Sequence, residues 1–218
     1  MRQASIAEFS LNVSLDYSRP VPFRDARLED IATDFCASKF GAYAVPKEIN
    51  LWNTNELFSY EMSIPIFNKV GSIIVNSQSL TVSIKQARTK ENLELILDLI
   101  FEVVDIATLE QPIKHCSVSF GAHVLFQSAG DFEGWMERYT SLSEKVLSGG
   151  AVLSLKMPEI RSELRYTSEK SLVHPKGVFL SANTVTDAEL KRDLFDYLGK
   201  QFEEAANLDD IRFSYSKT

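Results

Sequence analysis

The sequence is poor in the residues that most often build cofactor sites and disulfide frameworks. It contains two cysteines, nine glycines and three histidines among 218 residues. Two cysteines do not make a disulfide framework, so we interpret Cys36 and Cys116 as buried free thiols of a reducing compartment. No GxSxG, GxGxxG or GxxxxGK[ST] motif occurs. This argues against a serine-hydrolase elbow, a dinucleotide fingerprint and a P-loop.

The three histidines form no metal-binding pattern. His115 and His123 lie on the same face of one predicted strand. Eight residues at about 3.3 Å each separate them by roughly 26 Å, too far for one metal ion. Cys116 follows His115 directly, so the two side chains point to opposite faces and cannot act as nucleophile and base. We predict no catalytic residue, no cofactor and no metal site.

Long hydrophobic runs are also missing. The most apolar stretch, 93–106, contains the acids Glu94, Asp98, Glu102 and Asp105, and is too short and too charged to span a bilayer. The first residues, MRQASIAEFSLNVSLDY, lack the apolar run of a signal peptide. We therefore expect a cytoplasmic protein without membrane association.

Positive charge is in the minority. The net charge is −7 and the sequence pI about 5.1, which disfavours nucleic acid and anionic membranes as partners. Acids near the C-terminus, among them Asp209 and Asp210, are interpreted as part of an exposed end. Basic residues gather in one segment with acids between them, which predicts a solvated sheet face, with an anion-binding surface as the alternative. They are Lys156, Arg161, Arg165, Lys170, His174 and Lys176.

Strong period-2 alternation marks the beginning of the chain. Apolar residues occupy every second position from Ala7 to Tyr17, with polar residues between them. This pattern predicts a strand with one buried and one wet face. A similar alternation returns from Cys116 to Phe126.

The order of predicted elements repeats. A strand, a helix (28–40), an antiparallel meander and a second helix (89–106) fill the first half. The second half offers a strand (116–126), a helix (131–147) that Gly149-Gly150 closes, a meander and a helix (187–206). We predict an α+β fold of two tandem βαββα-like repeats, with mainly antiparallel sheets and helices packed on one face. The halves are 1–110 and 111–218, as separate halves or as one pseudo-twofold domain.

The two closing helices differ in character. Helix 89–106 is apolar all round except for one narrow acidic stripe, which predicts that it is covered on most sides, between the halves or under a partner subunit. Helix 187–206 is amphipathic. Thr186 and Glu189 have the spacing of a capping box at its start. Gly199 lies in its interior.

Three segments carry a resemblance to a sporadically distributed bacterial family of uncharacterised proteins. They are LTVSIKQARTKENLELILDLIFEVVD (80–105), CSVSFGAHVLF (116–126) and GVFLSANTVTDAELKRDLFDYLGKQFEEA (177–205). The central strand departs from that family, which usually has a glycine, an arginine and a tyrosine as in GLRYIN, where this chain reads Phe120-Gly121-Ala122-His123. The resemblance implies no catalytic residues.

These observations favour a non-catalytic cytoplasmic binding or protein-interaction protein. A protein partner or a second copy of the chain would use a sheet face or the apolar helix 89–106. The alternative is a small-ligand protein or enzyme with a pocket between the two halves. Nucleic-acid binding through a sheet is the weakest hypothesis. The candidate ligand or partner surface consists of His123, Trp52, Arg161 and Arg165.

Overall fold

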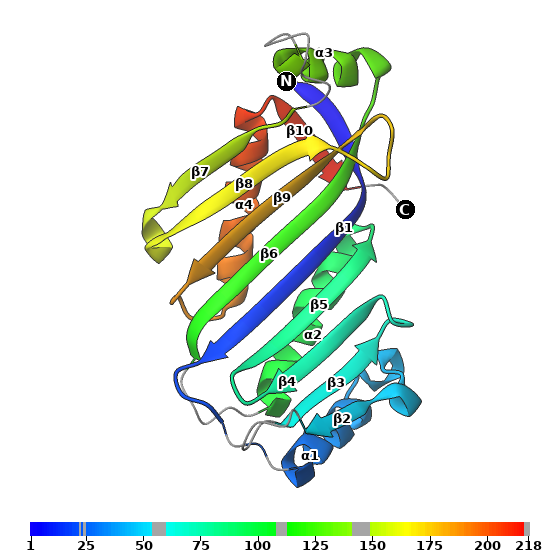
Figure 1. Cartoon of the computed structure of the whole chain (residues 1–218), viewed down its shortest axis with the longest axis vertical. Coiled ribbons are helices and arrows are strands. Elements are labelled where there is room, and N and C mark those ends of the chain that lie inside the picture. The colour runs from blue at the N-terminus through cyan, green and yellow to red at the C-terminus, as the bar shows by residue number, and fades with distance from the viewer. Residues whose placement is uncertain (22, 24, 54–59, 108–112, 141–148, 216–218) are drawn as a thin grey trace. The chain divides into compact units, whose positions relative to one another are not determined.

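The computed structural model describes residues 1–218 except 22, 24, 54–59, 108–112, 141–148 and 216–218. Within that part the predicted α+β class is confirmed, with four α-helices and a ten-stranded, mostly antiparallel sheet (Figure 1). The helices are α1 (Asp25–Ala37), α2 (Lys90–Ala107), α3 (Ala129–Thr140) and α4 (Arg192–Leu208). The strands are β1 (Arg2–Tyr17), β2 (Asn50–Asn53), β3 (Tyr60–Ile66), β4 (Gly71–Asn76), β5 (Ser79–Ala87), β6 (Ile113–Phe126), β7 (Val152–Met157), β8 (Ser162–Lys170), β9 (Gly177–Thr186) and β10 (Ile211–Tyr215).

Neighbouring strands follow the order β2-β3-β4-β5-β1-β6-β9-β8-β7, and β10 pairs with β1. The chain forms two compact units that share β1 and β6. Unit 1 comprises 1–10, 86–92 and 119–218, and unit 2 comprises 11–85 and 93–118. These units are defined by contacts in space, whereas the halves 1–110 and 111–218 rest on a sequence repeat that stays a prediction.

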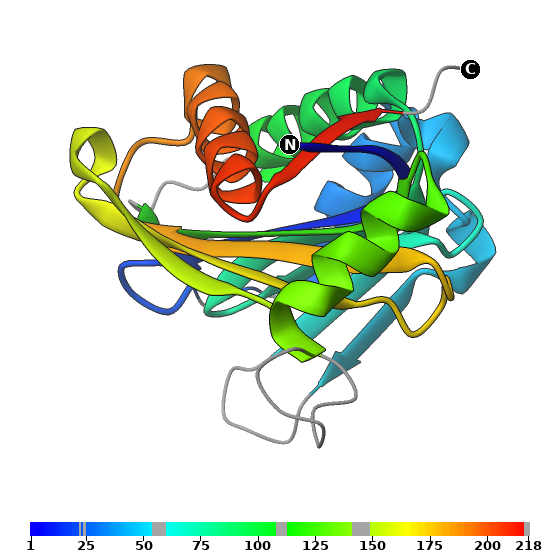
Figure 2. The ribbon, with the colours of Figure 1, turned by 90° about the horizontal axis from the view of Figure 1, so that it is seen from above.

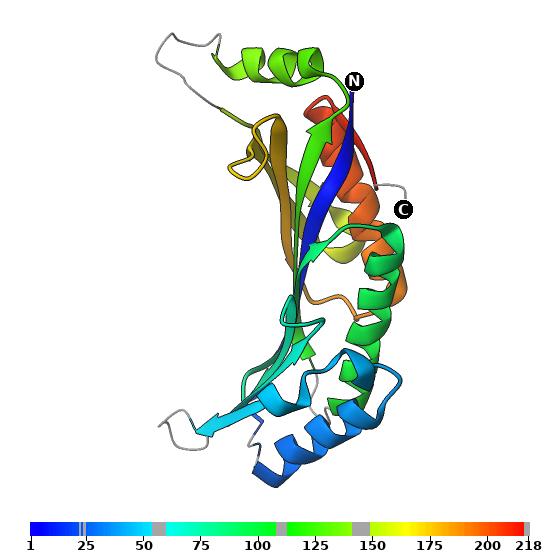
Figure 3. The same ribbon diagram turned by 90° about the vertical axis from the view of Figure 1, so that its right-hand side faces the viewer.

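Unit 2 is a meander with helices on one face. Figure 3 shows α1 and α2 against the same side of its strands. The registers place Ile64 opposite Ile73 and Ile73 opposite Val82, and all three side chains are buried. Alternate residues of β3, β4 and β5 thus form the floor of the core. Leu28, Ile31 and Phe35 of α1, at helical spacing, are buried as well.

Helix α2 has one fully buried face, made of Ile96, Leu97, Leu99, Ile100, Val103 and Ala107. The apolar residues beside that face are half-buried, namely Leu93, Leu95, Phe101, Val104 and Ile106. Glu94, Asp98 and Asp105 of the predicted acidic stripe are exposed. Cover of the half-buried side, between the halves or under a partner subunit, stays a prediction.

Unit 1 contains the strands β6 to β9 with α4 on one face, which Figure 2 shows most clearly. Strand β10 follows α4 and pairs in parallel with the beginning of β1, so that Ala4 lies opposite Phe213. The sequence analysis missed this pair, because five residues near the end of the chain carry too short a pattern. Helix α3 lies near the N-terminal end of β1 (Figure 1).

Strand β1 changes phase along its length. Ala4 and Ile6 are buried at even positions, whereas Phe9 and the alternate residues up to Tyr17 are buried at odd positions. Two half-buried residues, Ala7 and Glu8, separate the phases. A shift of one residue with a continuous buried face is the pattern that a β-bulge produces. The prediction of one strict alternation therefore holds only from Phe9 onward.

Helix α4 begins later than predicted. Thr186 ends β9, and its hydroxyl donates to the backbone oxygen of Ile160 and accepts from the amide of Ala188. The helix begins at Arg192, with Lys191 as N-cap and no side-chain capping bond. The predicted capping box of Thr186 and Glu189 was wrong, because Thr186 is the last residue of β9 and lies before the helix.

Gly199 lies exposed in the middle of α4, and a Cβ added there meets no atom within 4 Å. Gly199→Ala is expected to raise the free energy of unfolding by about 0.5–1 kcal/mol, because alanine has the better helix propensity and restricts the unfolded chain. Urea unfolding followed by circular dichroism measures the change. An unchanged or lower stability would contradict the prediction.

None of the helices in the described ranges combines the length and the apolar character needed to cross a membrane.

Candidate functional site

The open face of the unit 1 sheet carries one of the predicted site residues, His123, within a small polar cluster. Odd-numbered residues of β6 and β9 point away from α4, since their even-numbered neighbours Val124, Leu180 and Ala182 are buried. His123 lies on this open face, and its Nδ1 is 2.9 Å from the hydroxyl oxygen of Ser171. Ser171 follows β8 and is itself buried.

Ser171 links His123 to the loop that follows β8. The Ser171 Oγ accepts from the backbone amides of Val173 (3.2 Å) and His174 (2.9 Å). The same oxygen lies within hydrogen-bond distance of Nδ1 of His123, and the tautomer of the histidine sets the direction of that bond.

Aromatic rings surround this histidine. Phe179 lies 4.8 Å and His174 5.6 Å from it, measured between ring centroids. The Phe179 ring also covers Gly121, where an added Cβ would approach within 3.0 Å. Burial lowers the pKa of His123, Glu8 raises it and His174 lowers it, with burial the largest cause. We call His123, Ser171, His174 and Phe179 the His123 cluster.

The lowered pKa of His123 predicts a small loss of stability in acid. Below the ordinary histidine pKa of 6.5 the unfolded chain binds a proton that the folded chain resists, so the free energy of unfolding falls as pH falls through that value. Since the ring is only half-buried, the loss is expected to stay below about 1 kcal/mol. Urea unfolding between about pH 7.5 and 5 measures it for wild type and for His123→Gln, whose dependence on pH is expected to be weaker.

His115→Gln, on the same strand and outside the cluster, is the matched control. An equal weakening of the pH dependence in both variants would contradict the assignment to His123.

The His123 cluster holds an apolar loop between β8 and β9. Leu172 is fully exposed and Val173 is 61% exposed. Both follow Ser171, whose hydroxyl binds the loop amides, and the amide of Gly177 closes the loop on the oxygen of His174. We call residues 171–176 the β8–β9 tip. The β8–β9 tip exposes apolar side chains on a loop that is held by hydrogen bonds. The sequence analysis did not single it out.

Arg161 and Arg165 lie in unit 1, as His123 does, but they do not form one site with it. Arg161 follows a short 3₁₀ helix (Pro158–Ile160) in the left-handed conformation, with φ of 49°, and is exposed. Arg165 is exposed on β8 opposite Asn183. Phe179 lies opposite Glu169, four residues or about 13 Å further along the strand from Arg165. The basic segment is interleaved with acids, since Lys156 lies opposite Glu163.

The remaining candidates lie in unit 2. Trp52 of β2 is 40% exposed, opposite Glu61. Cys36 is half-buried rather than buried, and Cys116 is buried; both are free thiols. Burial, followed by the charge of Asp16, raises the pKa of Cys116 to about 12. The thiol therefore stays protonated near neutral pH and is a poor nucleophile.

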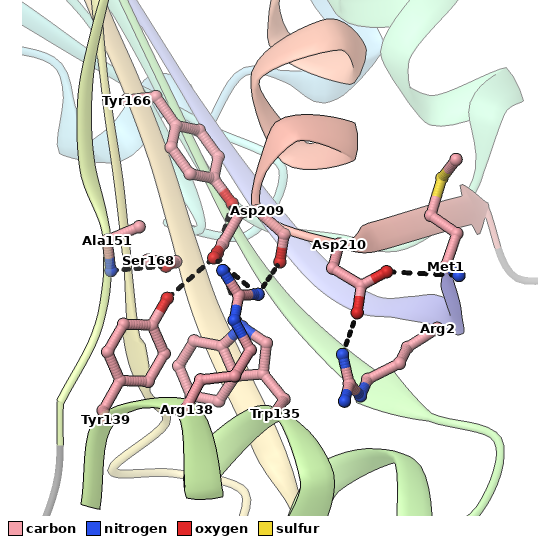
Figure 4. Close-up of polar contacts among 10 residues, drawn as sticks. All are labelled: Met1, Arg2, Trp135, Arg138, Tyr139, Ala151, Tyr166, Ser168, Asp209 and Asp210. Carbon is pink, nitrogen blue, oxygen red and sulfur yellow. Dashed lines mark hydrogen bonds and ion pairs between the residues drawn. The ribbon is translucent and has the colours of Figure 1, made fainter. Parts of the chain in front are cut away.

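A second polar cluster surrounds Asp209 at the end of α4 (Figure 4). Only 1% of this residue is exposed, so the prediction of an exposed acidic end was wrong here. Tyr139 donates to Oδ1 at 2.7 Å, Tyr166 to Oδ2 at 3.3 Å and the Trp135 indole to Oδ2 at 3.4 Å. Arg138 donates to the Asp209 backbone oxygen at 2.6 Å and lies 3.3 Å from Oδ1. We call these five residues the Asp209 cluster.

The Asp209 cluster joins α3, β8 and α4. Neighbouring Asp210 forms ion pairs with Arg2 and with the amino group of Met1. Burial is the largest cause that raises the pKa of Tyr139 to about 12, and burial raises that of Tyr166 as well. With its carboxylate oxygens occupied by donors and its tyrosines held neutral, the cluster is suited to stabilising unit 1 rather than to moving protons.

Among the described residues no group of three or more His, Cys, Asp or Glu side chains is arranged to hold a metal ion. Protein-family models give no match to the sequence, and neither do curated proteins.

Proposed function

We propose that this chain is a non-catalytic binding protein that acts by contact with another protein. The β8–β9 tip carries the proposal. Its Leu172 and Val173 side chains face solvent although the loop is tied down by Ser171. Two apolar side chains of this size are exposed to water on a hydrogen-bonded loop. Their burial against a partner would stabilise the complex by several kcal/mol. A loop ordered before binding also loses little entropy when it binds.

The surroundings of the tip support a protein partner over a charged ligand. The open face beside it combines the Phe179 ring and His123 with small polar residues such as Ser181, which shares a hydrogen bond with Thr167. An apolar projection beside an aromatic and polar surface resembles the anchor and rim of protein interfaces. The net charge of −7 disfavours nucleic acid.

Site-specific photo-crosslinking tests the proposal. A photoreactive amino acid at position 172 is expected to form a discrete protein adduct in cells that naturally express the chain, and mass spectrometry identifies it. The matched control places the same amino acid at Leu208, which is also exposed but lies at the end of α4. Adducts at 172 no stronger than at 208 would contradict the proposal.

The identified partner then allows a binding measurement. Leu172→Asp with Val173→Asp is expected to weaken binding at least about tenfold, since each lost apolar anchor is worth roughly 1–3 kcal/mol. Leu208→Asp is expected to leave binding unchanged. Equal affinity of both variants would place the interface elsewhere.

A further inference from the structure

Strand β7 leaves one edge of the unit 1 sheet unpaired. It is the last strand in the order β6-β9-β8-β7 and pairs only with β8 in the part of the chain that the structure describes. Figure 1 shows its outer side free of neighbouring strands. An edge of this kind presents backbone donors and acceptors that can add a further strand.

The register shows which backbone groups point outward. The amide of Ser168 donates to the backbone oxygen of Ala151, and the amide of Ala151 donates to the Ser168 hydroxyl, so both backbone groups of Ala151 point to β8. Since this orientation recurs every second residue, the odd-numbered residues of β7 bond to β8. The N–H and C=O groups of Val152, Ser154 and Lys156 therefore point away from the sheet.

Strand β7 carries little of the usual protection of an edge beyond its short length and one lysine. It contains no proline, and its one charged side chain, Lys156, lies near its end. Val152 is 65% exposed on the open face. On the α4 face Leu153 and Leu155 are only half-buried. Unguarded, apolar edge strands favour pairing with another strand.

We propose that β7 pairs antiparallel with β7 of a second copy of this chain, about a twofold axis at Ser154. The inference goes beyond the proposed function, because it names a partner at a surface separate from the β8–β9 tip. Ser154 of one copy then lies opposite Ser154 of the other, and Val152 of each copy lies opposite Lys156 of the other. These three residue pairs form about six backbone hydrogen bonds. Leu153 and Leu155 face one another in the close, non-hydrogen-bonded pairs and cover each other.

Charge placement argues for a second copy as the occupant. The twofold axis sets Lys156 opposite the apolar Val152, so that no like charges face each other across the new pair. Within each copy Lys156 keeps its neighbour Glu163. The two Arg165 side chains, on the β8 strands, remain three strand spacings or about 14 Å apart. The strand thus matches itself in length and hydrogen bonding and brings no like charges together.

Sedimentation velocity of the full chain over a range of concentrations tests the proposal. Wild type is expected to show a monomer–dimer equilibrium. Ser154→Pro removes the one outward N–H at the axis while leaving the bonds to β8 in place, and is expected to weaken the dimer at least about tenfold. Ser154→Ala, which keeps the N–H, is expected to dimerise like wild type. Circular dichroism and thermal unfolding verify that both variants fold.

A cysteine crosslink gives a second, independent readout. Residues that form a hydrogen-bonded antiparallel pair have Cα atoms about 5.5 Å apart, within the range of a disulfide. Ser154→Cys is expected to form a covalent dimer on mild oxidation, whereas Ser181→Cys, inside the sheet on β9, and the wild-type chain with its own two cysteines are not.

Wild type that stays monomeric at all concentrations, Ser154→Pro that dimerises like wild type, or a Ser154→Cys chain that gives no more dimer than Ser181→Cys would each overturn the proposal. Binding of a different protein at β7 by a monomeric chain would also overturn it. The photo-crosslink at position 172 reports on the proposed function without involving β7, so the two can fail separately.

Discussion

Replacing Asp209 by alanine is expected to lower the free energy of unfolding by about 2–4 kcal/mol. The side chain is fully buried and receives hydrogen bonds from Trp135, Tyr139 and Tyr166. Its removal leaves the buried Trp135 indole without this acceptor and takes one acceptor from the Tyr139 and Tyr166 hydroxyls, which also bond to Ser168. The exposed Arg138 guanidinium keeps the backbone oxygen alone. Each unsatisfied buried donor costs about 1–3 kcal/mol, and the losses are shared within one network.

Urea unfolding followed by far-ultraviolet circular dichroism is the suitable measurement, because Trp135 fluorescence would change with the contact itself. Asp209→Asn keeps one oxygen acceptor and is expected to lose less than the alanine variant. Asp196→Ala removes an exposed acid of the same helix and is expected to stay within about 0.5 kcal/mol of wild type. A loss below about 1 kcal/mol for Asp209→Ala would show that the cluster does not stabilise unit 1.

Local periodicity predicted the elements of this fold well. The period-2 runs in β1 and β6 and the apolar run in α2 each identify their element, because the burial of one side repeats with the geometry of the strand or helix. Trp135, on the inner face of α3, is fully buried.

Tertiary contacts decided what the sequence could not show. Thr186 has the spacing of a helix cap, but the neighbouring Ile160 oxygen and the end of β9 engage it instead. Asp209 resembles a surface acid in the sequence. It is buried because Trp135 and Tyr139 of α3 and Tyr166 of β8 pack around it. No local pattern encodes such meetings, since the partners lie 43 to 74 residues away.

The candidate site follows the same division. His123 was singled out as the histidine of an alternating strand, and it does lie on the open face of its sheet. Its hydrogen-bond partner Ser171 is 48 residues away in the sequence. The contact between His123 and the β8–β9 tip depends on the register of β8 and β9. Exposure of Leu172 and Val173 could not be derived either, because a short apolar stretch between two strands equally fits a buried turn.

Gly150→Ala is expected to lower the free energy of unfolding by about 3 kcal/mol and to loosen β7 from β8. A Cβ at this position would lie 1.7 Å from the backbone oxygen of Ser168 and 2.8 Å from its carbonyl carbon. The neighbouring Ala151 donates to the Ser168 hydroxyl and accepts from its amide, so the two backbones cannot separate without losing both bonds. Gly149-Gly150, predicted to close a helix, thus allows the close approach that starts the β7–β8 ladder.

Gly130→Ala is the matched control, because a Cβ there meets nothing nearer than the Ser128 hydroxyl oxygen at 4.0 Å, and it is expected to be neutral within about 0.5 kcal/mol. Hydrogen exchange measured by mass spectrometry on peptides from 149–157 is expected to quicken in Gly150→Ala and not in Gly130→Ala. Because the proposed twofold pairing needs β7 held straight along β8, the Gly150→Ala chain is also expected to dimerise less than wild type. A Gly150→Ala chain as stable as the Gly130→Ala chain would contradict the close contact with Ser168, and with it the register from which the outward groups of β7 were derived.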